Sequence, residues 1–146
     1  MNKYDKIKLE NQLCFPLYAL SREVIKLYKP LLDKYNLTYT QYVTMMVMWE
    51  HEKIIFKDLG QKLHLDSGTL TPVVKKLEAM KLIRKYRNKE DDRLVTLELT
   101  EKGRQLKDDV LEVPEIMYCK LKGDENNLSS LKKQLDDLLA SISQEN

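Results

Sequence analysis

The sequence predicts a mainly α fold of the α+β type, a winged helix-turn-helix with a three-element β wing. Two short helical patterns, at 56–63 and 67–80, are separated by a turn of about three residues, as in a helix-turn-helix. The hydrophobic period then changes from about 3.6 to about 2 in two segments around a charged tip, as in a β-hairpin. Residues 53–104 carry a net charge of +5, whereas the remaining residues sum to −3. A basic centre of this kind favours a nucleic-acid partner.

The length and composition are those of one globular chain. With 146 residues, 42% apolar and 33% charged, we expect a single domain over 1–146, with a winged lobe at 37–104 and dimerisation helices at 1–36 and 105–146. No apolar run approaches the roughly 18 residues of a transmembrane helix, and the N-terminus lacks the apolar stretch of a signal peptide. We therefore expect a cytoplasmic protein with no membrane partner.

The two cysteines, Cys14 and Cys119, and the two histidines, His51 and His64, show none of the short paired spacings of a zinc site. No metal and no cofactor is therefore expected. In a reducing cytosol, two cysteines so far apart in the sequence are expected to be a redox pair or two unrelated thiols rather than a permanent disulfide.

A first helix is expected from Lys6 to Tyr28, on an apolar stripe with spacings of three and four residues. Pro16 lies inside it and is expected either to kink the helix or to mark where its well-formed part begins. Pro30 should end the helix, because the residue before a proline is biased away from helical geometry.

The second helix should begin with a capping box, Thr38 with Gln41, and run to about His51. It is apolar nearly all round over residues 42–49, which predicts a place in the core. The helix-turn-helix follows, and its second helix should also turn one apolar face to the core. That face consists of Leu70, Val73, Val74, Leu77 and Met80.

The wing is expected to be a hairpin of strands 82–87 and 94–99, joined by a polar turn at 88–93. The start of the preceding helix should face base edges in a major groove, while lysines one turn later and the cationic hairpin meet phosphates or the minor groove. The residues expected at this duplex-DNA interface are Asp66, Ser67, Gly68, Thr69, Thr71, Lys75, Lys76, Arg84, Lys85, Arg87, Lys89 and Arg93. The alternative is a packing unit whose charges form a solvated face.

The C-terminal third should hold one helix from Thr100 to Gly123, interrupted by Pro114, and another from about Asn127 to Ser143. Together with the first helix, these helices have more apolar face than a small winged core can cover. Pairing with a second copy would bury that face, which predicts a homodimer. A dimer would bind a pseudo-palindromic operator with half-sites about one helical turn apart.

Over nearly its whole length the chain resembles the MarR-type winged-helix regulators. Segment 66–78 resembles that family's recognition helix, and 100–103 matches the turn that follows its wing. Asp91-Asp92-Arg93 fits the family's Asp-x-Arg wing signature. The resemblance implies that Asp91 braces the hairpin and that Arg93 meets DNA.

Segments 13–18 and 37–42, with Trp49-Glu50, are more specifically similar to the oxidation-sensing, OhrR-like branch of that family. The resemblance implies a reactive cysteine near the start of the first helix, tyrosines that hydrogen-bond its sulfur within a dimer, and a resolving cysteine that forms an intersubunit disulfide. The residues so implied are Cys14 as the reactive thiol, Tyr28 and Tyr39 with Tyr18 as a candidate third tyrosine, and Cys119 as the resolving thiol. Pro16 departs from the pattern expected of that helix.

A peroxide sensor needs a thiolate, whereas an ordinary cysteine is mostly protonated at neutral pH. Hydrogen bonds from tyrosine hydroxyls favour the charged form, and a helix that began near Pro16 would add the field of its N-terminus. Attack on a hydroperoxide gives a sulfenate, and condensation with a second thiol gives a disulfide. Because the sulfurs must come within about 2 Å, the backbone would move, and the winged lobes would change their spacing. The residues alone do not distinguish pairing within a subunit from pairing between subunits.

We therefore predict a DNA-binding regulator, a repressor, that is released when an organic hydroperoxide or a related oxidant oxidises Cys14. One alternative is that both cysteines are buried apolar residues. Another is a regulator that responds to a different oxidant or to a phenolic ligand. A thiol peroxidase is disfavoured because no Thr/Arg constellation surrounds Cys14, and the basic wing disfavours an adaptor without DNA; no enzyme is expected.

Overall fold

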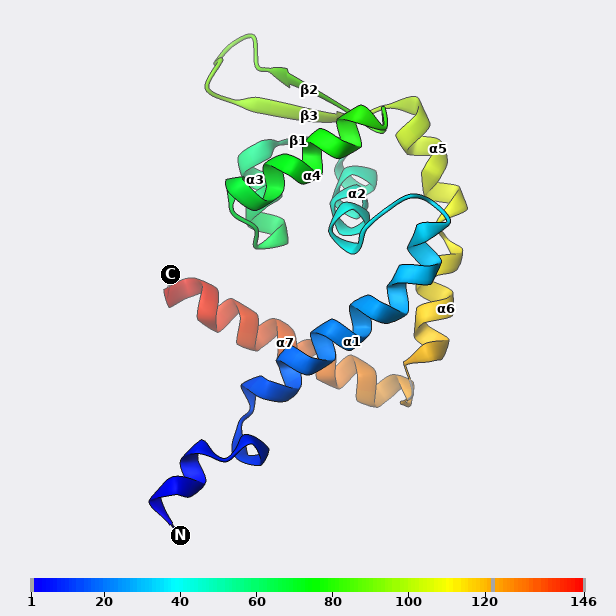
Figure 1. The fold of residues 1–146 in the computed structure, drawn as a ribbon. Helices are drawn as coiled ribbons and strands as arrows, with labels where there is room; N and C mark the ends of the chain where they lie inside the picture. Colours follow the sequence, from blue (N-terminus) through cyan, green and yellow to red (C-terminus); the bar gives the residue numbers. More distant parts are fainter. Residues whose placement is uncertain (1, 122, 146) are drawn as a thin grey trace.

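The computed structural model describes residues 2–121 and 123–145. It is mainly helical with one three-stranded antiparallel sheet, which confirms the predicted fold class. A winged lobe lies on one side, and α1, α6 and α7 extend on the other (Figure 1). In chain order the elements are the 3-10 turns η1 (Lys3–Ile7) and η2 (Leu9–Asn11), then α1 (Cys14–Asp33), α2 (Tyr39–His51), β1 (Lys53–Ile55), α3 (Phe56–Leu63), α4 (Ser67–Ala79), β2 (Ile83–Arg87), β3 (Val95–Leu99), α5 (Glu101–Asp109), α6 (Glu112–Lys120) and α7 (Glu125–Glu145).

The first helix differs from its predicted bounds at both ends. α1 begins at Cys14, and Pro16 is its third residue, where a backbone N–H would have no partner inside the helix. Pro16 therefore marks the helix start and does not kink it. The prediction that Pro30 ends the helix is wrong. Burial of Leu32 favours another turn, and the Lys26 carbonyl that Pro30 leaves unpaired lies on an exposed residue, where water can bond it.

The second helix and the helix-turn-helix follow the predicted pattern. The Gln41 N–H donates to Thr38 Oγ1 over 3.2 Å, and the Thr38 N–H donates back to Gln41 Oε1 over 3.0 Å, so the capping box is confirmed. Met45 and Met48 are fully buried beside the predicted face of α4, three members of which are buried and two partly buried. The core of the lobe therefore lies between α2, α3, α4 and the sheet.

The sheet has the order β1-β3-β2, with every pair antiparallel. Its central strand pairs Leu97 with Ile54 of β1 and Leu99 with Ile83 of β2. β1 is the third element of the predicted wing, and with three residues it is too short for an alternating pattern to reveal it in the sequence. The two wing strands lie within one residue of their predicted bounds.

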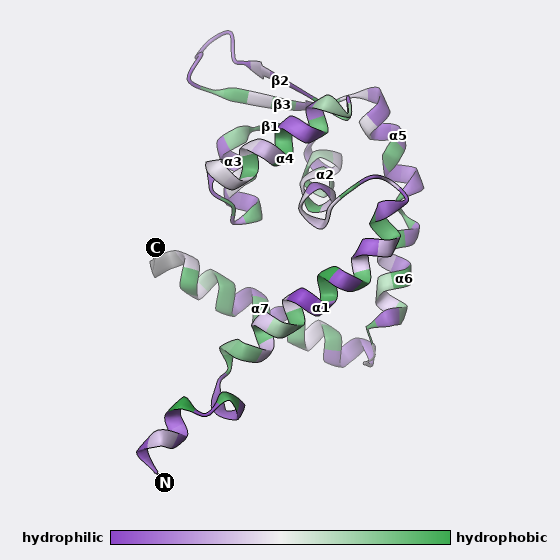
Figure 2. Cartoon of the chain, viewed as in Figure 1, coloured by the Kyte–Doolittle hydropathy of each residue, from purple (hydrophilic) through white to green (hydrophobic). Residues whose placement is uncertain are grey.

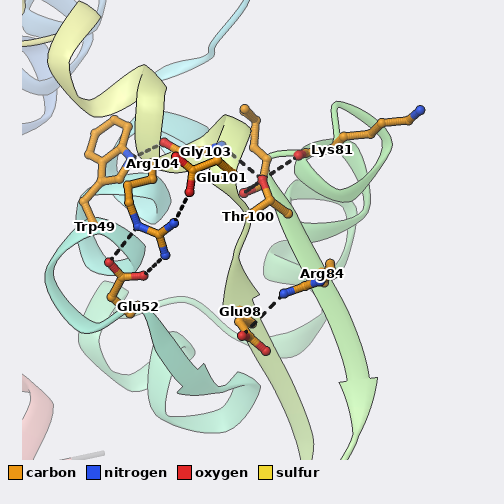
Figure 3. A network of polar contacts seen from close by, with 10 residues as sticks. Trp49, Glu52, Lys81, Arg84, Glu98, Thr100, Glu101, Gly103 and Arg104 are labelled. Carbon is orange, nitrogen blue, oxygen red and sulfur yellow. Dashed lines mark hydrogen bonds and ion pairs between the residues drawn. The ribbon is translucent and has the colours of Figure 1, made fainter.

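The base of the wing is joined to α2 and α5 at Gly103 (Figure 3). The Trp49 indole N–H donates to the Gly103 carbonyl over 2.8 Å, and the Gly103 N–H donates to Thr100 Oγ1 over 3.0 Å. A Cβ at Gly103 would lie 2.2 Å from the Leu82 carbonyl oxygen and 2.7 Å from the Leu99 side chain. Only glycine allows this close approach of three elements.

The predicted interruption of the segment from Thr100 to Gly123 is confirmed, and it divides the segment into the two helices α5 and α6. The break falls at Val110 and Leu111, three to four residues before Pro114, because a proline ring clashes with the carbonyl four residues earlier. The C-terminal end of α1 is fastened beside this break. The Tyr35 hydroxyl oxygen lies 2.7 Å from the Asp109 carbonyl oxygen and also contacts the Glu112 carboxylate, so its one proton has two acceptors, and the carboxylate pairs with Lys34 as well.

α7 extends two residues beyond its predicted bounds at each end. Apolar residues recur along α7 (Figure 2). Their side chains form a stripe that the rest of the chain leaves partly exposed. The stripe includes Leu131, Leu135, Leu138, Leu139 and Ile142. Among the described residues, no helix is long and apolar enough to cross a bilayer.

The close approach at Gly103 predicts a large effect of a single methyl group. Gly103→Ala should lower the free energy of unfolding by at least about 2 kcal/mol, because backbone must shift to admit the Cβ. Gly68→Ala is the matched control. Its Cβ would meet nothing closer than 3.4 Å, so it should gain about 0.5 kcal/mol from helix propensity. Urea unfolding measures both changes, and equal stabilities of the two variants would contradict the packing described here.

Candidate DNA interface and thiol site

The start of α4 is held by Asp66. Its carboxylate accepts the Thr69 N–H over 2.8 Å, and this bond lowers the pKa of the Asp66 carboxyl below its usual range. Asp66 was expected beside DNA; the structure places it as the N-cap that shapes the helix start. Ser67, Gly68 and Thr69 are exposed at this end of the helix, where an α-helix presents unpaired N–H groups.

One backbone acceptor at the same end is also free of the helix. Pro72 has no N–H, so the Gly68 carbonyl lacks its usual partner four residues later. The Thr71 hydroxyl does not replace that bond, because it donates to the Ser67 carbonyl over 2.6 Å. The helix start therefore offers both donors and an acceptor to a base edge or phosphate. Lys75 and Lys76, one turn later, are exposed.

The tip of the wing has the arrangement implied by the Asp-x-Arg signature. The Asp91 carboxylate accepts the Arg93 backbone N–H and two guanidinium N–H groups, over 3.1 to 3.2 Å. These bonds, the guanidinium ones first, lower the pKa of the Asp91 carboxyl. The Arg93 side chain nevertheless remains 89% exposed. Asp91 thus orients a cationic group that is open to a partner.

The other wing arginines have partners inside the hairpin. Arg84 pairs across the strands with Glu98 at 3.4 Å (Figure 3). The Tyr86 hydroxyl donates to the same carboxylate over 3.0 Å. Arg87 donates to the Asp92 carbonyl over 2.8 Å. Lys85 and Lys89 are exposed. The sequence analysis did not predict Glu98 as the counter-ion of Arg84. Glu98 alternates with the buried Leu97 and Leu99 along the strand, so the sequence places it on the outer face of the wing.

Cys14 and Cys119 are both free thiols on exposed residues, so the interpretation of them as buried apolar residues is wrong. Cys14 is the first residue of α1. This helix start has no capping side chain and no acidic residue in its first turn. No capping side chain therefore binds the backbone N–H groups at this helix start.

Tyr28 and Tyr39 lie together, with ring centroids 4.8 Å apart. Tyr42, which had been assigned only to the core, completes a cluster of three, 5.9 Å from Tyr28 and 6.4 Å from Tyr39. Tyr42 lies one turn after Tyr39 on α2, and this spacing could have predicted that the two side chains share a face. Burial raises the pKa of Tyr28 and Tyr39, and raises that of Tyr42 to about 12. All three hydroxyls therefore stay protonated, as hydrogen-bond donors, throughout the neutral range.

Cys14 does not lie beside this cluster in its own chain. Fourteen residues of continuous helix separate it from Tyr28, which at the rise of an α-helix is about 21 Å. A tyrosine side chain does not span that length. Tyr18, one turn from Cys14, is exposed and stacks under the guanidinium of Arg22 instead.

An apolar groove opens beside the tyrosine cluster, between α2 and the break of α5 and α6. Its volume is about 390 Å³. Tyr42 forms one wall and Leu111 another, and Met46 is exposed in it although most of α2 is buried. Glu50 and Lys107 stand among its lining residues. The sequence did not reveal this groove because it is made by residues from distant segments.

Comparisons with known proteins agree with this geometry. The family model described as transcriptional regulator SarA/Rot matches residues 26–110. The organic hydroperoxide resistance transcriptional regulator of Bacillus subtilis is 48% identical over 145 residues, covering 99% of each chain. Reduced AbfR bound to DNA superimposes with a TM-score of 0.83 at 29% identity, covering 98% of both chains. The disulfide form of AbfR, a Staphylococcus epidermidis protein, gives 0.66 at 30% identity, covering 94% of this chain and 96% of that one.

The Asp66 cap predicts a pH dependence of stability. Folding favours the charged carboxylate, so its contribution is complete above the ordinary pKa of 3.8 and is lost as the pH falls through the lower pKa of the folded state. Asp66→Asn keeps a capping oxygen but does not titrate. The stability of the natural chain relative to this variant should therefore decrease in acid. Urea unfolding from pH 6 to pH 2.5 measures this difference, and two parallel curves would be evidence against the cap.

Proposed function

The chain belongs to the SarA/Rot and MarR-type winged-helix transcriptional regulators, which bind DNA and are not enzymes, and we propose that it is a repressor released by oxidation of Cys14. The oxidant is an organic hydroperoxide or a chemically related species. The protein acts as a homodimer on a pseudo-palindromic operator. Oxidised Cys14 then forms a disulfide with Cys119 of the partner subunit.

The observation that supports this proposal most directly is the exposed position of Cys14 at the start of α1. The thiol is free and exposed at the first residue of α1, where a hydroperoxide can reach the sulfur. Exposed apolar side chains flank it, Leu13 at 69% and Phe15 at 43%. Such surroundings suit the apolar body of an organic hydroperoxide better than a fully hydrated oxidant.

The tyrosine donors are proposed to come from the partner subunit. Tyr28 is about 21 Å from Cys14 of its own chain along the continuous helix α1, and the Tyr39 ring packs against Tyr28. If the tyrosines hydrogen-bond the sulfur, as the family resemblance implies, a second chain must bring them there. The sensing site is then complete only in the dimer, and each dimer has two such sites.

The same geometry supports an intersubunit disulfide. α1 and α6 meet where Lys34 pairs with Glu112 at 2.9 Å. From that point Cys14 lies about 30 Å back along α1, whereas Cys119 lies only about 10 Å along α6. Bridged cysteines need Cα atoms within about 7 Å of each other. Pairing within one subunit would therefore require α1 to leave its place beside α6.

Two solved forms of a relative are consistent with a conformational switch. AbfR is described as bound to DNA in its reduced form and has a separate disulfide form. The present structure is more similar to the reduced, DNA-bound form, with TM-scores of 0.83 and 0.66. For this chain we infer that the reduced state is the DNA-binding one.

The DNA contacts are proposed to follow the arrangement of free groups on the lobe. The start of α4, with Ser67, Gly68, Thr69 and Thr71, enters the major groove. The exposed cations of α4 and the wing meet the backbone or the minor groove. These are Lys75, Lys76, Lys85, Lys89 and Arg93, with Arg84 and Arg87 closer to their hairpin partners.

The redox proposal is tested with cumene hydroperoxide and a duplex selected for binding from a random pool. The natural chain should bind the duplex when reduced and release it when oxidised. Cys14→Ser should stay bound, because no sulfenate can form. Cys119→Ser should form a sulfenate, detected with dimedone, but no covalent dimer on non-reducing electrophoresis.

Two outcomes would contradict the proposal separately. Release of Cys14→Ser by the hydroperoxide would exclude the thiol mechanism and favour a different signal, such as a phenolic ligand. A natural chain that forms the sulfenate and yet migrates only as a monomer would exclude the intersubunit disulfide. Sustained consumption of peroxide with a dithiol reductant would instead indicate a thiol peroxidase.

Replacing an exposed lysine of the interface should reduce DNA affinity together with its salt dependence. Lys89→Ala and Lys75→Ala should each lower the slope of log Kd against log salt by about 1, through the loss of one phosphate contact. Lys132→Ala, on α7 and paired with Asp136, is the matched control and should leave the slope unchanged. Fluorescence anisotropy between about 50 and 200 mM salt measures it. An equal effect of all three substitutions would point to nonspecific charge rather than to this interface.

A further inference from the structure

We propose that residues 2–13, the N-terminal arm, dock in the apolar groove between α2 and the α5–α6 break of the partner subunit. This inference rests on the proposed dimer and adds to it the place of the arm. The arm leaves α1 on the side away from the winged lobe (Figure 1). Within the described residues, every hydrogen bond that 2–12 make stays inside that segment.

Hydrogen bonds from side-chain amides within the arm hold its conformation. The Asn11 side-chain amide donates to the Asp5 carbonyl over 2.8 Å. The Gln12 amide donates to the carbonyls of Lys6 and Lys8, each over 2.8 Å. These bonds lie within the segment and hold its two 3-10 turns in place. A segment organised in this way loses less conformational freedom when it docks than a flexible tail would.

The arm presents apolar side chains to water. Ile7 is 78% exposed, Leu9 60% and Leu13 69%. Such side chains in a segment with a fixed shape are typical of a surface that is covered by a partner. The groove is the complementary feature, a volume of about 390 Å³ with Met46 and Leu111 exposed inside it.

Tyr42 connects the thiol site to the groove. It contacts both tyrosines proposed to bind the sulfur and also forms a wall of the groove. Leu13 is the residue directly before Cys14, and Leu9 lies about 10 Å from Cys14 along the chain at the rise of a 3-10 turn. If Cys14 lies at the partner's tyrosine cluster, both leucines lie near that cluster. The arm therefore reaches the partner's groove. It does not reach its own, which lies beyond the other end of α1.

The docked arm would cover the tyrosine cluster and form part of the wall around Cys14. It would exclude water from the donors while its apolar side chains line the approach of the hydroperoxide. Movement of α1 on disulfide formation would then withdraw the arm. The arm is thus a segment of one subunit that completes the thiol site of the other.

Photocross-linking locates the arm directly. Leu9 is replaced by p-benzoylphenylalanine in reduced full-length chain, and the variant is mixed with ¹⁵N-labelled natural chain so that products between subunits differ in mass. The expected product joins position 9 to the labelled peptide that contains Met46 or to the one that contains Leu111. Cross-links confined to one chain, or to α7 of the partner, would overturn the proposal.

Dimer dissociation gives an independent measurement. Leu13→Ser and Met46→Ser should each raise the dimer Kd at least tenfold in sedimentation equilibrium, and the double variant should show less than the product of the two effects. Tyr86→Ser, on the wing and 39% exposed, is the matched control and should not change Kd. Additive effects would overturn docking. A dimer indifferent to the arm overturns only this inference, whereas a natural chain that sediments as a monomer overturns the proposed dimer itself.

Discussion

The close packing at Gly103 is the contact on which the arrangement of the winged lobe depends. Without a side chain, this residue lets the start of α5 touch the Leu82 carbonyl and accept a bond from Trp49 of α2. Beside it, Arg104 binds Glu52 through two nitrogens and Glu101 through a third contact (Figure 3). α2, the base of the wing and α5 therefore form one body. A displacement of α5 should therefore move α2 and the base of the wing with it.

A second constraint is the length of α1. Twenty residues of continuous helix hold the thiol at one end and the tyrosine cluster near the other. The helix is fastened at its C-terminal end by Tyr35 and Glu112, next to the break before α6. α1 therefore connects Cys14 to the α5–α6 break of the same chain. In the proposed dimer, each α1 would connect the thiol site at the partner subunit to the winged lobe of its own chain.

The described residues include three exposed apolar surfaces: the N-terminal arm, the groove at α2, and the stripe of α7. In a monomer of this size so much exposed apolar side chain is unfavourable. The surfaces are explained together if two copies exchange them, the arms entering the grooves and the long helices pairing. The free thiols then lie within the assembled region and not on an unrelated face, which suits a signal that changes the assembly without dissolving it.

The sequence by itself determined the local elements: the capping box of α2, the two helices of the helix-turn-helix, the wing strands and the braced tip at Asp91 and Arg93. Each depends on contacts between residues close in the chain, so periodicity and capping chemistry predict the helices and strands, and the family resemblance implied the contact of Asp91 with Arg93. The third strand, the continuation of α1 through Pro30, and the meeting of Tyr42 with Tyr28 were decided only by the tertiary structure. In these cases burial against distant segments outweighs the local preference. The separation of Cys14 from Tyr28 belongs to the same class, because it depends on α1 continuing unbroken from one residue to the other.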